Sequence, residues 1–330
     1  MKKISLKNAK TMIKGASILS CGGGLPYIEQ NTYLDSLNFK KNVKILNPDE
    51  LSGMESNTVF VTASEIGPAD DPPIDKTKVP EMIQLFIKKT GKQVGGIMPV
   101  EIGQESIVFD TALKSNLPII NSDLAGLRAV PKASMNALKM QNVPFTRSPL
   151  VVLTNAGKIL FIDKNNSLEE DEKQLRQIAR DTHGVIFAIG GFITAPIIQK
   201  YLNHASQKTI YDIGICIEKH TDFVKKVPLP LVYSAQGIIQ KITNINTSGF
   251  SEKEACILVD QPHNNTFTVS IKNEYMKLTN GNHTFQFPQL ITLFSKNLGR
   301  GLSSSELTAG MAVQIYVFNP LPCWNNFSSN

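Results

Sequence analysis

Hydrophobic positions follow two different periods along the chain. In the first part, apolar side chains spaced three and four residues apart indicate amphipathic helices, and short apolar, β-branched runs between them indicate strands. Strand and helix in this alternating order predict an N-terminal, mainly parallel α/β layered domain. The expected helices are 6–20, 27–37, 81–90, 105–116, 167–182, 194–202 and 209–220, the strands are 42–46, 58–63, 94–102, 117–123 and 185–192, and a hairpin spans 149–163.

Near Ile238 the pattern changes to an alternation of apolar and polar residues with a period of two. Turns rich in Asn and Gly separate these runs, as they do between hairpin strands. We therefore expect three parts. They are an N-terminal α/β domain with a glycine loop at 1–165, a connecting part at 166–237 that completes the α/β region, and a C-terminal β-rich domain at 238–330.

Composition narrows the class of protein. The 330 residues are 42% apolar and 19% charged, which is typical of a globular protein with a sizeable core. No apolar run is long enough to cross a membrane, and the basic N-terminus lacks the apolar stretch of a signal peptide, so we expect a cytoplasmic protein. The net charge of +6 is spread along the chain without a nucleic-acid-binding module. We expect a small-molecule ligand, no nucleic acid, no membrane, and a homodimer as the plausible assembly.

The cysteines and histidines of the sequence do not have the spacing of known metal sites. The four cysteines lie far apart, and the five histidines show neither an HxH nor an HExxH pattern. Cys21 stands out only because it adjoins a run of glycines, and we interpret it as a buried thiol. Spacing alone therefore names no metal ligand.

Acidic residues follow three neighbouring predicted strands. Glu65, Glu101 and Asp123 lie in loops that leave the carboxyl ends of these strands. Such ends meet at one edge of a parallel sheet, where ligands bind. Glu101 is either a base or ligand or the cap of a helix, and Asp123 is the stronger functional candidate. We expect Glu65 and Asp70, in a proline-rich loop, to be solvated.

Three consecutive glycines, Gly22, Gly23 and Gly24, precede a predicted helix. Glycine loses much backbone freedom when it is ordered, so the run marks either a tight turn or a loop whose bare amides approach a ligand. Arg128 lies after the strand-end acids. Its guanidinium either holds a substrate carboxylate through two hydrogen bonds or pairs with a neighbouring acid.

Several segments, taken in order, resemble one family. The segment "ILSCGGGLPY" matches the family's opening glycine loop, "PVEIG" at 99–103 matches its "PVEIGG", and "NLPIINSDLAGLRAVPK" loosely matches a later strand and loop. Further echoes are "TSGF" at 247–250, "NEYM" at 273–276, "PQLI" at 288–291 and "GMAVQI" at 310–315. Together they resemble the S-methyl thiohydantoin desulfurase domain family, which is associated with hydantoinases.

The resemblance implies an α/β domain, a β domain and an active site at the glycine loop. It implies hydrolysis of a small cyclic imide or thioimide (hydantoin-like) ring, with loss of sulfur at a ring carbon and help from a divalent metal such as Zn or Mn. Glu101 and Asp123 would be base or metal ligands. The substrate would be bound by Gly22, Gly23, Gly24, Gly103 and Arg128.

Four positions depart from the family pattern. Leu25, Asn121, Lys132 and Gln289 stand where the family has acidic residues. These losses support a second hypothesis, in which the protein is a relative that has lost catalysis and binds a small anionic ligand or a partner protein.

Overall fold

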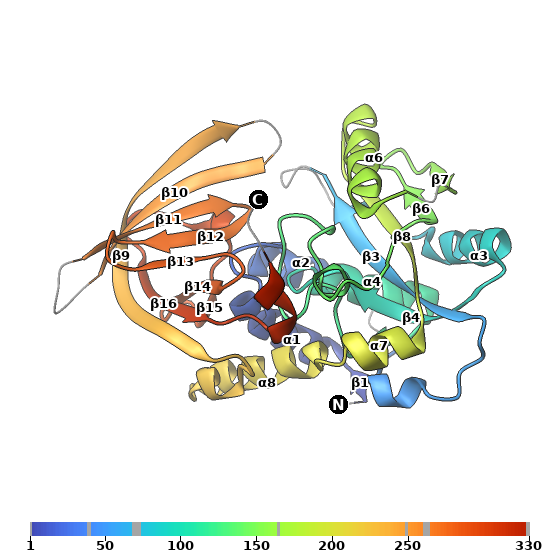
Figure 1. Cartoon of the computed structure of the whole chain (residues 1–330), viewed down its shortest axis with the longest axis horizontal. Helices are drawn as coiled ribbons and strands as arrows, with labels where there is room; N and C mark the ends of the chain where they lie inside the picture. The colour runs from blue at the N-terminus through green and yellow to red at the C-terminus, as the bar shows by residue number, and fades with distance from the viewer. Residues whose placement is uncertain are drawn as a thin grey trace.

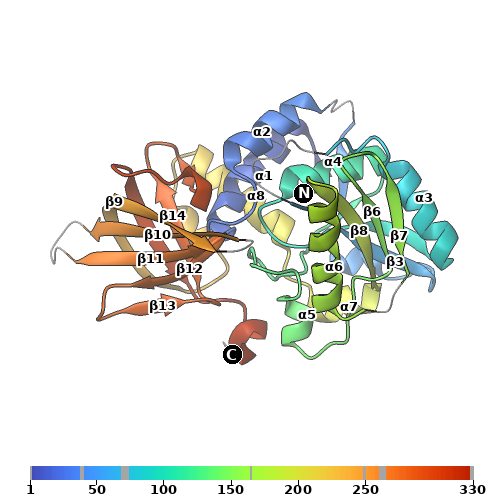
Figure 2. The same cartoon turned by 90° about the horizontal axis from the view of Figure 1, so that it is seen from above.

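The computed structural model describes residues 2–37, 41–67, 74–163, 166–247, 250–259 and 265–327. Two lobes stand side by side, and each is built on one sheet (Figure 1). The first is an α/β lobe and the second an antiparallel β lobe. Helices α1 (Leu6–Leu19), α2 (Tyr27–Ser36) and α8 (Ser206–Glu218) lie at the junction, as the view from above shows (Figure 2).

The sheet of the α/β lobe has the order β1-β2-β5-β4-β3-β8-β6-β7. Strands β2, β5, β4 and β3 run parallel to one another, and the strands on either side of them join antiparallel. The predicted α/β layer is confirmed, with its parallel strands grouped together in a mixed sheet. The strands are β1 (Lys3–Ile4), β2 (Val43–Leu46), β3 (Thr58–Ile66), β4 (Gln93–Pro99), β5 (Ile119–Ile120), β6 (Leu150–Leu153), β7 (Ile159–Ile162) and β8 (Ile186–Ile193).

Helices cover both faces of this sheet because successive strand residues point to opposite sides. Val59 and Val61 of β3 pack in one core with α3 and α4, whereas Phe60 between them packs with α5 and α7. Leu175 of α6 packs on β6 and β8. The helices are α3 (Val79–Thr90), α4 (Glu105–Ser115), α5 (Ala137–Met140), α6 (Leu168–Asp181) and α7 (Ala195–Tyr201).

Local signals place the helix ends as predicted. The Ser167 hydroxyl accepts a hydrogen bond from the Glu170 amide at 3.2 Å, and the Glu170 carboxylate accepts one from the Ser167 amide at 2.7 Å. This reciprocal pair satisfies two amides at the start of α6. Helix α3 ends at Gly91, whose φ of 69° is the left-handed conformation expected of a C-terminal glycine.

Helix α1 connects the two lobes. A Cβ on Gly15 would lie 1.7 Å from the Ile210 carbonyl oxygen of α8, so glycine is needed for the close crossing of these helices. Toward the other lobe, the Ile18 carbonyl accepts a hydrogen bond from the Thr292 hydroxyl at 2.5 Å. Thr292 belongs to the β lobe, so one helix packs on both sheets.

The β lobe is one antiparallel sheet with the order β13-β12-β11-β10-β9-β16-β14-β15. Strand β12 contacts β14, so the sheet curves around its own core, in which Phe267 and Val269 are buried. It begins at Leu231 rather than near Ile238, because Leu231 to Gly237 already pair with β16. The strands are β9 (Leu231–Thr247), β10 (Phe250–Val259), β11 (Thr266–Lys272), β12 (Glu274–Thr279), β13 (Thr284–Gln286), β14 (Leu290–Ser295), β15 (Arg300–Gly301) and β16 (Ala312–Phe318).

Strand β4 is shorter than predicted. It ends at Pro99 rather than continuing to 102, because the next residues bond to a loop instead of to a strand. The Val100 carbonyl accepts a hydrogen bond from the Ala125 amide at 2.9 Å, and the Ile102 amide donates to the Arg128 carbonyl at 3.0 Å. This loop pairing brings the segment around Glu101 alongside residues 125–130.

Among the helices in the described ranges, none combines the length and the apolar character needed to cross a bilayer.

Candidate functional site

The glycine loop lies where the α/β lobe meets the beginning of β12. A Cβ on Gly22 would lie 2.6 Å from the Tyr275 ring, and one on Gly23 would lie 2.5 Å from the Glu274 carboxylate. Gly22, with a φ of +82°, also occupies the left-handed region that favours glycine. The glycines therefore allow the loop to pack directly on two side chains of the β lobe.

The same loop also packs on the turn after β4. A Cβ on Gly24, whose φ is +74°, would lie 2.4 Å from the Gly103 carbonyl oxygen, and that oxygen accepts a hydrogen bond from the Leu25 amide at 2.9 Å. The Gly23 amide donates to the Ser20 carbonyl at 2.8 Å. The structure thus brings Gly22, Gly23, Gly24 and Gly103 together, and it uses two of the nearby amides within the protein.

A small cavity opens beside the loop. Its volume is about 10 Å³, which is the room that one water molecule needs. Gly23 and Gly103 line it together with Ser17, Ser20 and Ser303. A ring-shaped ligand needs more space, so the loop or a neighbouring side chain has to move before such a ligand can bind here.

Glu101 is buried in the α/β lobe beside the loop at 125–130. One carboxylate oxygen accepts a hydrogen bond from the Val130 amide at 2.8 Å, and the other accepts one from the Gln104 side chain at 3.1 Å. Burial is the main cause that raises the pKa of Glu101 to about 7, although these two hydrogen bonds oppose it. The group therefore exchanges its proton near neutral pH, as a general base does.

Two further buried carboxyl groups, Glu105 and Glu274, stand near Glu101 and were not predicted as site residues. Burial raises the pKa of each to about 8. Glu105 accepts hydrogen bonds from the Gly103 amide at 3.0 and 3.1 Å. The Oε2 atom of Glu274 is buried and has no hydrogen-bond partner among the described residues. The charge of Glu101 acts on both groups, and we call these three buried carboxyl groups the acidic cluster.

The sequence carries a weak signal for Glu274. It stands in an alternating β segment between Ile271 and Tyr275, both of which are buried. A carboxylate beside such positions is unusual, because a buried charge is costly unless it has a partner. Nothing in the local pattern says that Glu274 meets the glycine loop, since that contact joins residues far apart in the chain.

The carboxylate of Asp123 forms hydrogen bonds with its own loop. It accepts hydrogen bonds from the amides of Gly126 at 2.6 Å and Leu127 at 3.0 Å. The His204 ring nitrogen Nε2 lies 2.9 Å from the same carboxylate. Asp123 is fully buried and holds the turn that carries Arg128, while its catalytic role stays a prediction.

The Arg128 guanidinium contacts residues of both lobes. Its Nη1 donates to the Pro288 carbonyl and its Nε donates to the Ala129 carbonyl at 3.1 Å. It stacks on the Phe287 ring at 4.1 Å and lies 5.1 Å from the Trp324 ring. Within the described ranges no acid forms an ion pair with it. Burial lowers its pKa, although the nearby Cys21 and Glu274 oppose this.

Cys21 is buried, as expected, and is unsuited to nucleophilic attack. Its thiol donates to the Leu19 carbonyl at 3.3 Å. Burial raises the pKa of the thiol to about 12, so it stays protonated.

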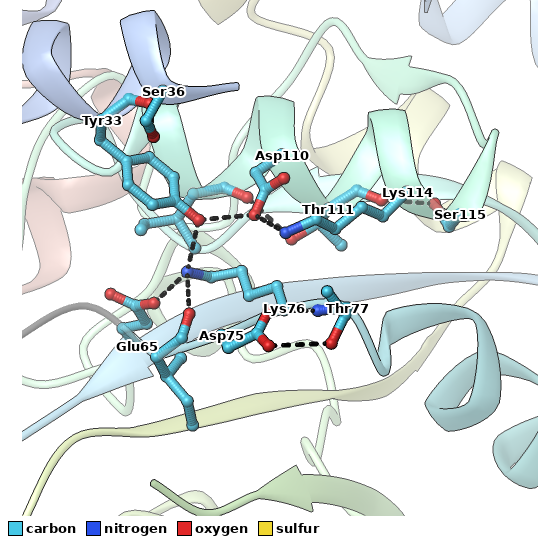
Figure 3. Close-up of polar contacts among 12 residues, drawn as sticks. Tyr33, Ser36, Glu65, Asp75, Lys76, Thr77, Asp110, Thr111, Lys114 and Ser115 are labelled. Atoms are coloured by element: carbon cyan, nitrogen blue, oxygen red, sulfur yellow. Dashed lines mark hydrogen bonds and ion pairs between the residues drawn. The ribbon is translucent and has the colours of Figure 1, made fainter. Parts of the chain in front are cut away.

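The expectation that Glu65 is solvated is wrong. Its carboxylate is mostly buried and forms an ion pair with Lys76, which is fully buried (Figure 3). The Lys76 ammonium also donates to the Tyr33 hydroxyl at 3.0 Å, and that hydroxyl donates to Asp110 at 2.5 Å. Lys114 completes the chain with an ion pair to Asp110 at 2.9 Å. The acid folds inward because a buried cation from the segment after it supplies the partner.

Asp70, paired with Glu65 in that expectation, lies outside the described residues.

Comparison with known families establishes membership. The S-Me-THD-like N-terminal domain matches residues 7–164, and the S-Me-THD-like C-terminal domain matches residues 166–328. The chain belongs to the S-Me-THD-like family. This confirms the resemblance that the ordered motifs indicated. The family division falls between β7 and α6, so the second family domain also supplies β8 to the sheet of the first lobe.

A solved structure shares the fold of this S-Me-THD-like chain. A crystal structure of a protein from Chromobacterium violaceum superposes with a TM-score of 0.70 at 16% identity, and the match covers 96% of this chain and 92% of that one. At this level of identity the likeness shows a common fold. No curated protein matches the chain.

The donor set does not fit the divalent metal that the S-Me-THD-like resemblance implied. Within the described ranges, no group of three or more His, Cys, Asp or Glu side chains is placed to hold an ion. The carboxylate oxygens of Asp123 and Glu105 already accept hydrogen bonds from backbone amides. These carboxylate oxygens, like those of Glu101, are therefore engaged in hydrogen bonds within the protein.

Two of the positions that depart from the family pattern serve the fold. Asn121 donates to the Asn47 side chain at 2.8 Å and accepts from the Lys208 amide at 3.0 Å. Gln289 accepts from the Gln286 amide at 3.2 Å. Lys132 is exposed, and Leu25 packs on the main core. These substitutions leave the acidic cluster of Glu101, Glu105 and Glu274 complete.

Proposed function

We propose that the protein hydrolyses a small cyclic imide or thioimide ring at the junction of its two lobes. The observation that carries this proposal is the acidic cluster of Glu101, Glu105 and Glu274, of which Glu274 adjoins Gly23 and Glu105 accepts hydrogen bonds from the Gly103 amide. Buried carboxyl groups with raised pKa values are frequent at catalytic sites, because they gain and lose protons near neutral pH. Membership of the S-Me-THD-like family supports the choice of ring.

In the proposed reaction, Glu101 in its carboxylate form takes a proton from water. The water oxygen forms a bond with the ring carbon that carries sulfur, and negative charge develops on the adjacent ring heteroatom. Amides of the glycine loop, with those of Gly22 and Gly24 as the candidates, would stabilise this charge. The carbon–sulfur bond then breaks, and sulfur leaves as a thiol after it takes the proton of the neutral Glu274 carboxyl. The hydroxyl proton moves to the ring nitrogen, so the ring keeps a carbonyl and gains an N–H, and the proton held by Glu101 returns through water to Glu274.

Turnover of ring compounds tests the proposal. Purified protein is incubated with an S-methylthiohydantoin and with a hydantoin, and thiol release and ring opening are followed separately. Glu101→Gln keeps the shape of the side chain but removes the base, so we expect kcat to fall by about 10²-fold or more. Glu274→Gln removes the acid and is expected to slow thiol release. The exposed Glu55→Gln is the matched control and is expected to act as the wild type does.

A second candidate function is binding without turnover. Four family acids are replaced, which favours a relative that holds a small anionic ligand or a partner protein. A thermal-shift series with hydantoins, thiohydantoins and their carboxyalkyl derivatives separates the two. A shift with no turnover at any pH would support binding, whereas turnover that Glu101→Gln abolishes would exclude it.

A further inference from the structure

Two polar side chains at the start of α8 are buried without partners. Ser206 and Gln207 are the first two residues of this helix, and they are 0% and 1% exposed. The Ser206 hydroxyl has no hydrogen-bond partner in the part of the chain that the structure describes, and neither has Oε1 or Nε2 of the Gln207 carboxamide. The preceding Ala205 supplies no side-chain cap. The beginning of α8 is therefore a polar place in the interior.

A buried carboxamide without partners is costly, because burial removes the water that would otherwise bond to it. Such a group in a folded protein calls for an explanation. The neighbouring Lys208 amide shows the contrast, since it donates to the Asn121 side-chain oxygen at 3.0 Å. The chain thus supplies an acceptor to the backbone of this turn but leaves the side chain of Gln207 open to a ligand.

The start of α8 lies at the same edge of the sheet as Glu101. Asn121, which accepts from the Lys208 amide, directly follows β5, and Glu101 follows β4. These two strands are parallel neighbours, so their carboxyl ends lie side by side at the edge where α/β proteins bind ligands. Asp123, two residues after Asn121, is close enough for its charge to act on Glu101.

The packing of α8 on α1 places Gln207 near the glycine loop. A Cβ on Gly214 would lie 2.0 Å from the Thr11 carbonyl oxygen, and one on Gly15 would lie 1.7 Å from the Ile210 carbonyl oxygen. One turn earlier in α8 therefore corresponds to one turn later in α1. Gln207 precedes Ile210 by three residues and Gly214 by seven, so it shares their helix face. It faces the end of α1, from which the glycine loop leaves.

The free atoms of Gln207 define the chemistry of the ligand. Oε1 accepts hydrogen bonds and Nε2 donates them, and the two stand side by side. A ring in which an N–H adjoins a carbonyl offers the matching donor and acceptor, so both atoms are satisfied by two parallel hydrogen bonds. An anion offers only acceptors and an ammonium group only donors, so each would leave one of the two atoms unpaired.

We propose that Gln207 binds the edge of the substrate ring at which an N–H adjoins a carbonyl, so that the substrate class is a ring with an unsubstituted lactam or imide edge. This inference rests on the proposed function, because it places the same ring at Glu101. In a thiohydantoin-type ring, the carbon that carries sulfur lies on the other side of that nitrogen. Binding of the edge by Gln207 leaves this carbon free for attack by water.

Calorimetry with hydantoin and 1,3-dimethylhydantoin tests the inference, because the methyl groups remove both N–H donors of the ring. We expect the wild type to bind hydantoin more tightly by about tenfold or more. Gln207→Met keeps the approximate shape without the polar atoms. We expect it to abolish this preference and to leave the affinity for the dimethyl ring unchanged. Gln240→Met, on the exposed side of β9, is the matched control and is expected to keep the preference.

Thermal unfolding without ligand gives an independent readout. Gln207→Met removes buried polar atoms that lack partners, so we expect Tm to rise by about 1 °C or more. A role of Gln207 in the fold alone predicts the reverse, because the substitution would then break hydrogen bonds. A lower Tm, or a Gln207→Met variant that fails to fold, would overturn the inference.

Turnover of an S-methylthiohydantoin separates this inference from the proposed function. If the wild type releases thiol while Gln207→Met keeps the preference for hydantoin, the proposed function stands and the inference fails. Equal affinity of the wild type for the two rings overturns the inference as well. If Gln207→Met loses the preference and no ring is turned over, the recognition stands and the hydrolytic function fails. Neither binding nor turnover of any ring overturns both.

Discussion

At the scale of single residues, burial sets the chemistry of the site. Glu101, Glu105 and Glu274 are buried, and withdrawal from water raises the pKa of each above its ordinary value of 4.5, to about 7, 8 and 8. The same withdrawal keeps Cys21 protonated. The site therefore holds groups that are suited to proton transfer and lacks a reactive thiol.

The raised pKa values also make stability depend on pH. The folded protein holds protons that the unfolded chain releases above about 4.5, so this contribution is complete below that pH and is lost as pH rises through about 8. We expect Tm to fall between about pH 5 and 8, where the folded protein binds more protons than the unfolded chain. Glu105→Gln, which cannot ionise, should show a smaller fall. An equal fall in the variant and the wild type, measured by circular dichroism, would contradict the burial of this acid.

Close neighbours of the glycine loop explain its glycines better than their positive φ angles do. Gly22 and Gly281 have nearly the same φ, +82° and +85°, but only Gly22 has a neighbour within 4 Å of the position a Cβ would take. Gly281→Ala is expected to cost about 1–2 kcal/mol for its backbone alone. Gly22→Ala meets the Tyr275 ring as well, and we expect roughly 1–3 kcal/mol more. Equal costs in urea unfolding would show that the contact with Tyr275 does not matter.

At the scale of elements, the polar chain from Lys114 to Glu65 links α4, α2 and β3 (Figure 3). Lys76 lies at its centre with no exposed surface. Its ammonium has three acceptors, namely the Glu65 carboxylate, the Tyr33 hydroxyl and the Ile74 carbonyl. Each acid of the polar chain has a lysine as its ion-pair partner, so we assign the chain to the fold.

Breaking this polar chain at its centre should be costly. Lys76→Met leaves Glu65 buried without its partner, and we expect a loss of about 3–5 kcal/mol in the free energy of unfolding. Adding Glu65→Leu removes the orphaned acid and should recover much of that loss. Lys139→Met, which breaks an exposed ion pair with Glu169, is the control and should cost below about 1 kcal/mol. A Lys76→Met variant as stable as the control would contradict this picture.

Sequence patterns predicted the elements whose cause is local. The capping box at Ser167 and the glycine at Gly91 act within one helical turn, and both ends were placed correctly. The end of β4 was not, because Val100 pairs with a loop that comes later in the chain. The prediction that Glu65 is solvated was also wrong, because its burial depends on the ion pair with Lys76.

The candidate site follows the same rule. Glu101 was named because it follows a strand at the carboxyl edge of the sheet, which is a property of the sequence order. Glu274 was missed, because its significance comes from its contact with Gly23, which lies far away in the chain. Hydrophobic periodicity carries no signal for such contacts.

At the scale of the whole molecule, the lobes share one packed junction. Helix α1 contacts α8 as well as β14 and β15 of the β lobe. Near the C-terminus, the Trp324 indole nitrogen donates to the Ala125 carbonyl of the α/β lobe at 3.0 Å. The proposed site lies in this junction, so the site and the joint between the lobes depend on the same contacts.

Trp324 is the only tryptophan in the sequence and therefore reports on this junction. We expect its fluorescence and the far-ultraviolet circular dichroism to change in a single coincident transition on heating, because the junction and the sheets are packed together. A fluorescence change at clearly lower temperature, with secondary structure intact, would show that the lobes separate first. The homodimer stays a prediction, and size-exclusion chromatography at several concentrations tests it.

The most direct test of the central claim is the dependence of kcat/KM on pH for thiol release from an S-methylthiohydantoin. Glu101 must be ionised to accept a proton from water, so the rate should rise as pH passes about 7. Glu274 must be protonated to release the thiol, so the rate should fall above about 8. A bell-shaped profile whose rising limb disappears in the residual activity of Glu101→Gln is the predicted result. A profile that is flat across this range, or one that Glu101→Gln leaves unchanged, would contradict the account.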